Sequence, residues 1–243
     1  MPKKPTKWRI KVWCLTDSES RYVWTFDVYC GANKGVSGIK GSKNGEAKQG
    51  VNVVHALLEG LENRGHIVVM NNFFSSVPLF IELLGKGTYA TGTVRANRIG
   101  FPTALAKKSL YAKSPQGHLE WRMHASKKIS AIVWVDKKPV LVMSTVAPPI
   151  HGVGEECPVV SRRVGSVRKD VETSPMHYQY TTYMRGVDVA DQLRGEYSSQ
   201  VRTHKWWHRL FYFLLDTTVV NMWKLHCKQS LTLETRPLSH KSF

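Results

Sequence analysis

The stretch His66–Leu84, HIVVMNNFFSSVPLFIELL, holds a strand, a polar turn and the start of a helix in direct succession. Ile67–Met70 is a short apolar run rich in β-branched residues, which predicts a fully buried strand. The apolar pattern stops at Asn71 and Asn72. In open α/β sheets, ligands bind beyond the carboxyl ends of the strands, and here two neutral amides occupy that position.

A helix follows this polar turn. The hydroxyls of Ser75 and Ser76 can accept hydrogen bonds from its first backbone amides, and Pro78 suits its first turn. Gly85 and Gly87 end it, because glycine adopts a left-handed helix cap at little cost. Its apolar face comprises Leu79, Phe80, Leu83 and Leu84.

Elements on both sides of this stretch extend it into an α/β core. Apolar residues recur at helical spacing between Val51 and Leu61, after a basic, Gly-rich loop at residues 31–50. Residues 88–94 predict another strand. The order strand, helix, strand predicts a mixed sheet with flanking helices.

The N-terminal region predicts an antiparallel hairpin. Residues Trp8–Leu15 and Tyr22–Tyr29 alternate apolar with polar side chains, and a polar turn joins them. Asp17 stands where the first strand ends. By residue type alone, Asp17 is first of all a turn former.

The second half of the chain changes character twice. Strand-like runs at residues 117–124, 128–135 and 139–146 predict a β-rich insertion, and an irregular basic connector follows at 157–174. The chain becomes helical at Tyr183, and we expect a long helix after Thr203 to be largely buried. We therefore divide the chain into a first part of the core at 1–100, the insertion and connector at 101–175, a helical second part of the core at 176–228, and a flexible tail at 229–243.

The charge of the chain points to a polyanionic partner. Its 243 residues carry a formal net charge of +17, with 42% hydrophobic residues, which is a globular composition. The four cysteines form no C-x-x-C pair, which argues against a zinc module and suits a reducing compartment. The apolar cluster Leu210–Leu215 is too short to span a bilayer, so we expect no membrane association.

Aspartates at two places could belong to one metal site. Asp17 ends the first strand, while Asp188 and Asp191 share one helix surface after the insertion. Two Mg²⁺ ions held by carboxylates are a common arrangement for phosphoryl transfer. On residue type alone, these acids are equally turn and helix-surface residues.

Three blocks of sequence resemble the piggyBac-type transposases. Residues 1–31 resemble their first catalytic strands, residues 71–102 resemble their DNFF(S/T)S…GTVR-N block, and residues 183–198, YMRGVDVADQLRGEYS, resemble their YM-GGVD-ADQ block. The resemblance implies a ribonuclease H-like core with a β-rich insertion and an ancestry of Mg²⁺-dependent DNA cut-and-paste. It begins inside the family's catalytic region, so we expect the family's N-terminal DNA-binding segments and C-terminal zinc module to be missing here.

The resemblance also assigns the catalytic and metal-binding positions. The family's first catalytic aspartate falls on Asp17 and its third on Asp188, with the neighbouring acid on Asp191. The second falls on Asn71, whose amide brings no negative charge and cannot bridge two dications as a carboxylate does. Arg185 replaces a glycine of the family and places a cation near Asp188. We predict little or no strand cleavage.

Cations distributed along the chain can neutralise phosphates without reading bases. Trp206 and Trp207, beside His204 and Lys205, could stack on an unpaired base or, more simply, belong to a helix core. The predicted DNA-binding residues are Lys40, Lys43, Arg95, Arg98, Arg162, Arg163, Arg168, Lys169, Arg202 and Lys205.

Several functions are compatible with these patterns. The first is a nuclear, catalytically inactive domain that binds DNA largely through its backbone, alone or as a homodimer. The second keeps weak Mg²⁺-dependent strand cleavage, with Asn71 tolerated. The third is an interaction partner or inhibitor that forms a heterodimer with a related, intact transposase. A relic without function is the remaining alternative.

Overall fold

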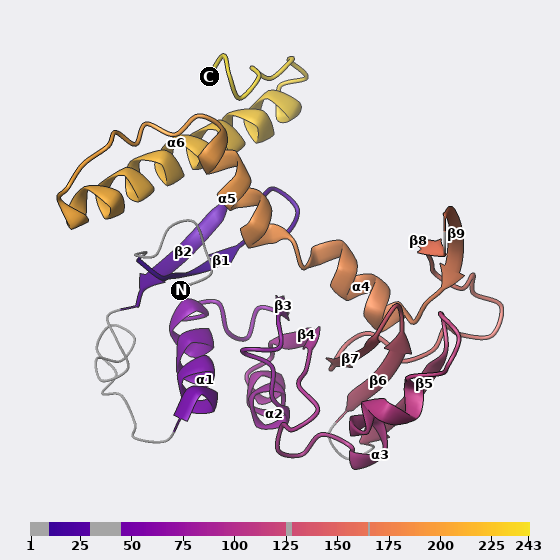
Figure 1. Cartoon of the computed structure of the whole chain (residues 1–243). Helices are drawn as coiled ribbons and strands as arrows, with labels where there is room; N and C mark the ends of the chain where they lie inside the picture. The colour runs from indigo at the N-terminus through magenta and orange to yellow at the C-terminus, as the bar shows by residue number, and fades with distance from the viewer. Residues whose placement is uncertain (1–9, 30–44, 125–127, 165) are drawn as a thin grey trace. The chain divides into compact units, whose positions relative to one another are not determined.

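The computed structural model describes residues 10–29, 45–124, 128–164 and 166–243 (Figure 1). These residues fall into two units. The central unit spans residues 44–184, and the terminal unit combines residues 1–43 with 185–243. The predicted divisions near residues 100, 175 and 228 remain predictions.

A five-stranded mixed sheet organises the central unit. The parallel pair joins β3 (Ile67–Met70) to β4 (Tyr89–Thr93), and the other neighbours run antiparallel. The order is β3-β4-β7-β6-β5, which confirms the predicted mixed α/β architecture. The remaining strands are β5 (Leu119–His124), β6 (Ile129–Val135) and β7 (Pro139–Ser144).

The β3–α2–β4 segment follows the sequence pattern closely. Helix α2 (Val77–Gly85) begins at the N-cap Ser76, whose hydroxyl accepts a hydrogen bond from the Leu79 amide at 3.4 Å. Gly87 has the left-handed φ of +57°, whereas Gly85 is the last helical residue. The apolar face is fully buried and comprises Leu79, Phe80 and Leu83.

One prediction for this segment is wrong. Strand β3 was expected to be fully buried, but it forms an edge of the sheet and Ile67 is 46% exposed. Only Met70, at its carboxyl end, is buried. An apolar run of this length has the same composition at an edge as in the centre of a sheet, so its sequence does not show how many neighbours the strand has.

Helix α1 (Gly45–Leu57) also differs from its prediction. It begins inside the expected loop and ends at Leu57, before the predicted end at Leu61. The rest of that expected loop, residues 31–44, lies outside the described residues. The close approach of Gly50 to the Phe73 carbonyl packs this helix against the turn after β3.

The strands expected in the insertion continue the sheet of β3 and β4. Strand β7 pairs with β4 as well as with β6, and every residue of β6 is buried. Two short helical segments precede β5, namely α3 (Thr103–Ala106) and the 3₁₀ helix η1 (Lys108–Tyr111).

The stretch expected to be an irregular connector is regular. Strands β8 (Val159–Val164) and β9 (Val167–Glu172) form an antiparallel hairpin, and helix α4 (Pro175–Tyr183) follows it. The chain therefore becomes helical before Tyr183, because Ser174 caps α4 by accepting the Met176 amide.

The terminal unit contains a hairpin and two helices. Strands β1 (Val12–Thr16) and β2 (Val23–Val28) pair antiparallel, as predicted, although β1 begins later than expected. Helices α5 (Gly186–Glu196) and α6 (Trp206–Thr232) follow in the C-terminal part. The amide of Asn221 exchanges two hydrogen bonds of 2.9 Å with the backbone of Val23, which fixes α6 on β2.

The prediction that α6 is largely buried is wrong. Trp206 is 72% exposed, and Trp207, Phe211 and Met222 are each about half exposed. The helix packs instead through Asp216, Thr217 and Val220. No helix in the described residues is long and apolar enough to cross a membrane.

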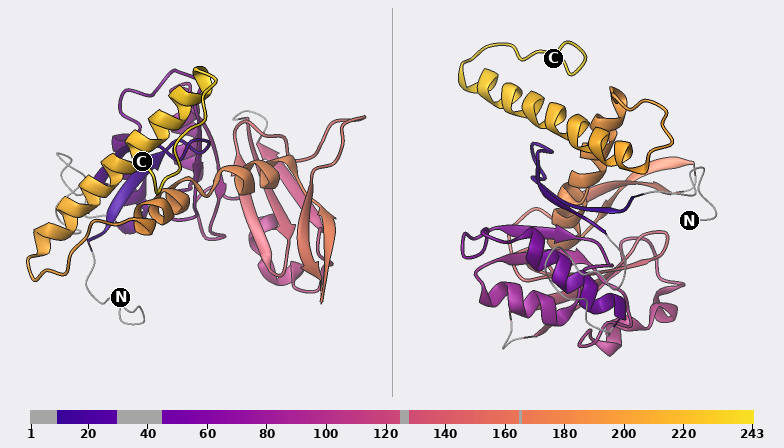
Figure 2. Two further views of the ribbon diagram at one scale, coloured as in Figure 1. Left: turned by 90° about the horizontal axis from the view of Figure 1, so that it is seen from above. Right: turned by 90° about the vertical axis from the view of Figure 1, so that its left-hand side faces the viewer.

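The end of the chain is more ordered than a frayed tail. Helix α6 continues to Thr232, past its expected end at residue 228. The last residues return along α6 (Figure 2), where Trp223 Nε1 donates to the Leu238 carbonyl at 3.0 Å. His240 stacks on Trp223 with ring centroids 4.5 Å apart.

Candidate functional site

Asp17 organises the turn that joins β1 to β2. Its carboxylate accepts hydrogen bonds from the Glu19 and Ser20 amides, both at 3.2 Å, and from the Ser20 hydroxyl. The Asp17 backbone closes the turn with Tyr22 and Arg21, and Arg21 adopts a left-handed φ of +68°. The predicted turn-forming role is therefore present in the structure.

This environment keeps Asp17 ionised. Partial burial would by itself raise the pKa of the carboxyl group. Hydrogen bonds from the Ser20 hydroxyl and the two amides, together with the nearby Arg21, outweigh that effect and lower the pKa below its ordinary value. Asp17 is thus an exposed carboxylate at a strand end, which is the chemistry that a divalent cation requires.

The start of α5 packs on the same strand end. A methyl group on Gly186 would overlap Thr16 Oγ1 and lie 3.5 Å from Ser18 Cα. A larger residue would therefore push α5 away from the residues on either side of Asp17. Asp188 lies in the first turn of α5, so Gly186 keeps the helix turn that carries Asp188 close to the Asp17 turn.

We expect Gly186→Ala to weaken the packing between α5 and β1. The added methyl group overpacks Thr16, at a cost of about 1–3 kcal/mol that the better helix propensity of alanine offsets only in part. The matched control is Gly195→Ala in the same helix, where a Cβ meets no atom within 4 Å. Hydrogen exchange of residues 12–28 should increase in the first variant and stay unchanged in the second; equal exchange in both would contradict this packing role.

Asp191 is already engaged in an ion pair. Its Oδ1 accepts from Arg194 Nη2 at 3.0 Å on the exposed side of α5. Asp188 and Asp191 therefore share one helix, as predicted. Arg185 is the N-cap residue of α5 and is exposed.

Asn71 sits in the central unit, directly after β3. Its side-chain Oδ1 accepts the Phe73 amide at 2.9 Å, and its carbonyl accepts the Ser75 hydroxyl at 3.0 Å. The backbone amides of Phe74 and Ser75 also reach that carbonyl, both at 3.2 Å. Four hydrogen bonds thus fix this turn, and an aspartate could accept the same bond from Phe73.

Two of the predicted DNA-binding residues support this turn. Arg98 Nη2 donates to the carbonyls of Asn72 and Phe73, at 3.1 and 2.6 Å, and Arg95 Nε donates to Asn72 Oδ1 at 3.4 Å. These contacts give both arginines a structural role in positioning the Asn71 turn. Their role in DNA binding stays a prediction.

Gly92 allows the turn after β3 to pack closely against β4. Gly92 pairs with Met70 across the parallel strands, and a Cβ there would overlap the Met70 carbonyl and lie 2.5 Å from Ser75 Oγ. Ser75 is completely buried. The sequence pattern by itself assigns no function to Gly92 or Gly186, although both lie in the blocks that carry the resemblance.

The other predicted DNA-binding residues fall into three groups. Arg162, Arg163, Arg168 and Lys169 lie on the β8–β9 hairpin, whereas Arg202 and Lys205 precede α6 and are exposed. Lys40 and Lys43 lie outside the described residues. Of the hairpin cations, Arg162 forms an ion pair with Asp136 at 3.3 Å.

The four predicted catalytic positions are distributed over both units. Asp17, Asp188 and Asp191 belong to the terminal unit, and Asn71 belongs to the central unit. In the described part of the chain, no three His, Cys, Asp or Glu side chains group closely enough to hold a metal ion. A two-ion centre requires anionic oxygen ligands, and the neutral amide of Asn71 does not fit the position that the resemblance assigns to its second anion.

Comparisons with known proteins agree with the sequence blocks. The chain is 29% identical over 246 residues to the human PiggyBac transposable element-derived protein 3, covering 99% of this chain and 38% of that protein. It is 28% identical over 229 residues to the human PiggyBac transposable element-derived protein 2, covering 92% of this chain and 36% of that protein. The chain thus spans less than two fifths of the length of these curated relatives.

A solved structure shares the fold. The cryo-EM structure of a piggyBac transposase synaptic complex with hairpin DNA matches with a TM-score of 0.77 at 21% identity, covering 99% of this chain and 45% of that chain. A family model described as Transposase IS4 matches residues 1–223. The chain therefore belongs to this transposase family and is of the piggyBac type.

Proposed function

We propose that this chain is a piggyBac transposase-derived domain that binds DNA through its basic surface and does not cleave it. The observation that carries the proposal is Asn71, a neutral amide fixed at the carboxyl end of β3 by its bond to the Phe73 amide. Because four hydrogen bonds hold that turn, Asn71 has a fixed conformation at the end of β3, where it brings an amide oxygen but no charge.

The proposal includes a ribonuclease H-like core with a degenerate metal site. The likeness to the piggyBac transposase structure supports the fold, and the ends of β1 and β3 and the start of α5 carry the three assigned positions. Loss of one anion from a two-metal centre removes charge stabilisation of several kcal/mol from the transition state. Since about 1.4 kcal/mol corresponds to a factor of ten, the rate falls by orders of magnitude.

Binding of DNA is supported by charge and by the structural neighbour. The net charge of +17 favours a polyanion, and the neighbouring structure is a transposase bound to hairpin DNA. Backbone contacts of this kind release counterions, so the affinity should fall steeply with salt and depend little on sequence. We place this activity in the nucleus, where duplex DNA is available.

The proposal is tested by comparing cleavage and binding in one preparation. The unchanged protein should bind a 30-base-pair duplex at low salt and should not cut it in the presence of Mg²⁺. Asn71→Asp should keep the thermal stability of the unchanged protein, because aspartate accepts the same hydrogen bond from Phe73. Magnesium-dependent cleavage by the unchanged protein that is lost in Asp17→Ala would overturn the inactivity, and absent binding would overturn the DNA-binding function.

Two observations favour the alternative functions. The lowered pKa keeps Asp17 ionised, and the close packing at Gly186 holds the helix turn with Asp188 near the Asp17 turn. These two carboxylates favour residual Mg²⁺-dependent cleavage. The exposed apolar side chains of α6, among them Trp207, Phe211 and Met222, favour a non-catalytic partner of a related transposase. Co-purification with such a transposase, without DNA affinity, would support the second alternative.

A further inference from the structure

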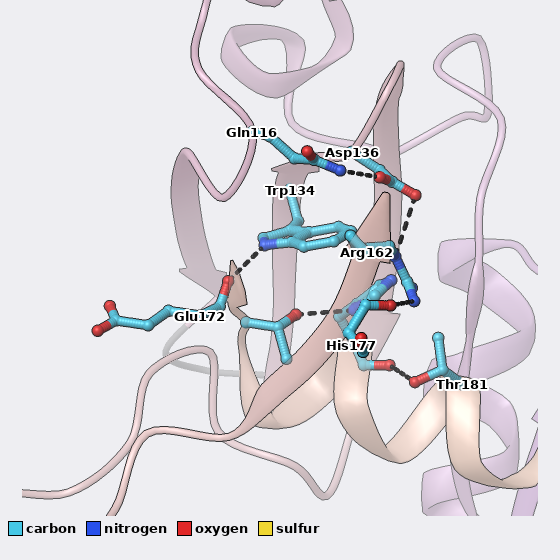
Figure 3. Close-up of polar contacts among 9 residues, drawn as sticks. Gln116, Trp134, Asp136, Arg162, Glu172, His177 and Thr181 are labelled. Carbon is cyan, nitrogen blue, oxygen red and sulfur yellow. Dashed lines mark hydrogen bonds and ion pairs between the residues drawn. The ribbon is translucent and has the colours of Figure 1, made fainter. Parts of the chain in front are cut away.

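The β8–β9 hairpin is anchored at its base in the core of the central unit. Trp134 is completely buried, and its Nε1 donates to the Glu172 carbonyl at the end of β9, at 3.1 Å (Figure 3). Val160 and Val171 pack against the buried cluster that contains Trp134. The Thr173 amide closes the base by donating to the Pro158 carbonyl at 2.8 Å.

A polar network beside Trp134 fixes the orientation of the hairpin. Arg162 on β8 pairs with Asp136 at 3.3 Å, and Gln116 Nε2 donates to the same carboxylate at 2.6 Å (Figure 3). The Arg162 guanidinium also lies 5.7 Å from the Trp134 ring centre. Arg162 therefore has a structural role within the protein, and its role as a phosphate contact stays a prediction.

A buried histidine completes this anchor. His177 on α4 is 3% exposed, stacks on Trp134 with centroids 4.1 Å apart, and lies 2.7 Å from the Thr173 hydroxyl through Nδ1. Burial, with a smaller contribution from Arg162 that outweighs the opposing Asp136, lowers the pKa of His177 to about 4. The ring is thus neutral at pH 7, so the anchor adds no further charge beside Arg162.

The opposite face of the hairpin carries cations that have no such role. Because side chains alternate along a strand, Arg163 points away from the face that holds Arg162 and Val160. Register places Arg163 directly opposite Arg168 on β9. Both are exposed, and within the described residues neither forms an ion pair. The exposed acids Asp170 and Glu172 follow on this face of β9 towards the base of the hairpin, so the two arginines lie nearer the turn than these acids.

Two cations on directly opposite residues of paired strands repel each other and weaken the strand pairing, unless an anion lies between them. In the hairpin, Arg163 and Arg168 form such a like-charged pair on the exposed face. The base of the hairpin is fixed by the hydrogen bond from Trp134. A pre-ordered pair of arginines binds phosphates at a lower entropic cost than cations on a flexible basic tail. The arrangement therefore suits a repeating array of phosphates.

We propose that the outer face of the β8–β9 hairpin, with Arg163 and Arg168, is an arm that binds duplex DNA; this rests on the proposed DNA-binding function. A two-stranded ribbon fits the major groove of B-form DNA with the arginines at the flanking phosphates. The major groove of A-form RNA is too narrow to admit it. The hairpin, rather than Arg95 and Arg98, then makes the decisive contacts within the central unit.

The test compares two double variants of the full chain. The first, Arg163→Gln with Arg168→Gln, removes two charges from the outer face. The control, Lys107→Gln with Lys113→Gln, removes two exposed charges from the segment between α3 and β5. Affinity for a 30-base-pair DNA duplex is measured at several salt concentrations, and circular dichroism confirms that both variants fold.

The expected result is a specific loss in the hairpin variant. Removing two phosphate contacts should lower the slope of log affinity against log salt by about 1.8, and the affinity by roughly 10- to 60-fold at 0.1 M salt. The control should change the slope by much less. Equal losses in both variants, or stronger binding of duplex RNA than of DNA by the unchanged protein, would overturn the arm while leaving the basic surface as the binding site. No binding by the unchanged protein would overturn the proposed function as well.

Discussion

Replacing Gly92 with alanine should unfold the β3–β4 half of the central sheet. A Cβ at this position overlaps the carbonyl oxygen of Met70 and lies 2.5 Å from the hydroxyl of Ser75. The carbonyl belongs to the paired strand backbone and cannot rotate away, so the strands must separate. Overpacking of this kind costs about 3 kcal/mol, which is a large part of the stability of an ordinary domain.

The consequences should reach the Asn71 turn. The Ser75 hydroxyl donates to the Asn71 carbonyl, and displacement of Ser75 releases that bond. Hydrogen exchange of residues 67–75 and 89–93 should therefore increase together. This variant also tests whether the turn depends on the parallel pair rather than on its own hydrogen bonds.

The matched control lies in the neighbouring helix. Gly85→Ala introduces the same methyl group at the last residue of α2, where no atom lies within 4 Å and φ is not left-handed. We expect an unchanged or slightly raised thermal midpoint, because alanine reduces the entropy of the unfolded chain. If the two variants had the same midpoint, the steric role of Gly92 would be excluded.

The contrast between α2 and α6 shows what the sequence could and could not predict. For α2, the capping serine, the proline and the apolar face lie within one local stretch, and each acts through neighbours in sequence. For α6, helical spacing identified the apolar stripe but not the face that packs. The packing face is set by the distant bonds between Asn221 and Val23, which no local pattern contains.

The β8–β9 hairpin was missed for a related reason. Its arginines and lysine made residues 157–174 resemble a solvated connector, although Val160 and Val171 alternate with polar residues. The decisive interaction is the burial of Trp134 against the hairpin base, which joins residues far apart in sequence. Alternation alone cannot distinguish a ribbon with one buried face from a charged loop.

Part of the candidate site was predictable at the level of single residues. Asp17 and Asn71 both lie directly after strands, as the sequence predicted, because strand ends are marked by a local change in polarity. The roles of Gly92 and Gly186 were not predictable, since close approach between backbone segments leaves no signal except the glycine itself. The hydrogen bonds from Arg98 to the backbone of the Asn71 turn were likewise not predictable, because they depend on packing between separate elements.

Replacing Asp216 with alanine should destabilise the terminal unit in a pH-dependent way. Asp216 on α6 is 5% exposed and accepts three hydrogen bonds from the segment between α5 and α6. These come from the Ser198 hydroxyl at 2.7 Å and from the Ser199 amide and hydroxyl at 3.0 and 2.5 Å. Because bonds to a charged acceptor are stronger than average, we expect a loss of about 2–3 kcal/mol at pH 7.

The sign of the pH dependence follows from the pKa of Asp216. Burial alone would raise this pKa, but the bonds from Ser199 and Ser198, with Arg194 nearby, outweigh burial and lower it. A carboxyl group with a lowered folded pKa stabilises the fold above its unfolded pKa of about 3.9, and the stabilisation is lost as the pH falls through the folded pKa. The difference between the unchanged protein and Asp216→Ala should therefore be full at pH 7 and shrink towards pH 3.

Two further variants separate charge from shape. Asp216→Asn keeps the size of the side chain and one acceptor oxygen but cannot titrate, so its stability relative to Asp216→Ala should not depend on pH. Ser199→Ala removes the donor of the shortest bond, and its effect should largely disappear in the Asp216→Ala background. Urea unfolding at pH 7, 5 and 3, followed by hydrogen exchange of residues 197–220, measures each difference. An equal loss at all three pH values would show that Asp216 acts through packing alone, and the anchoring of the α5–α6 segment would then not depend on its charge.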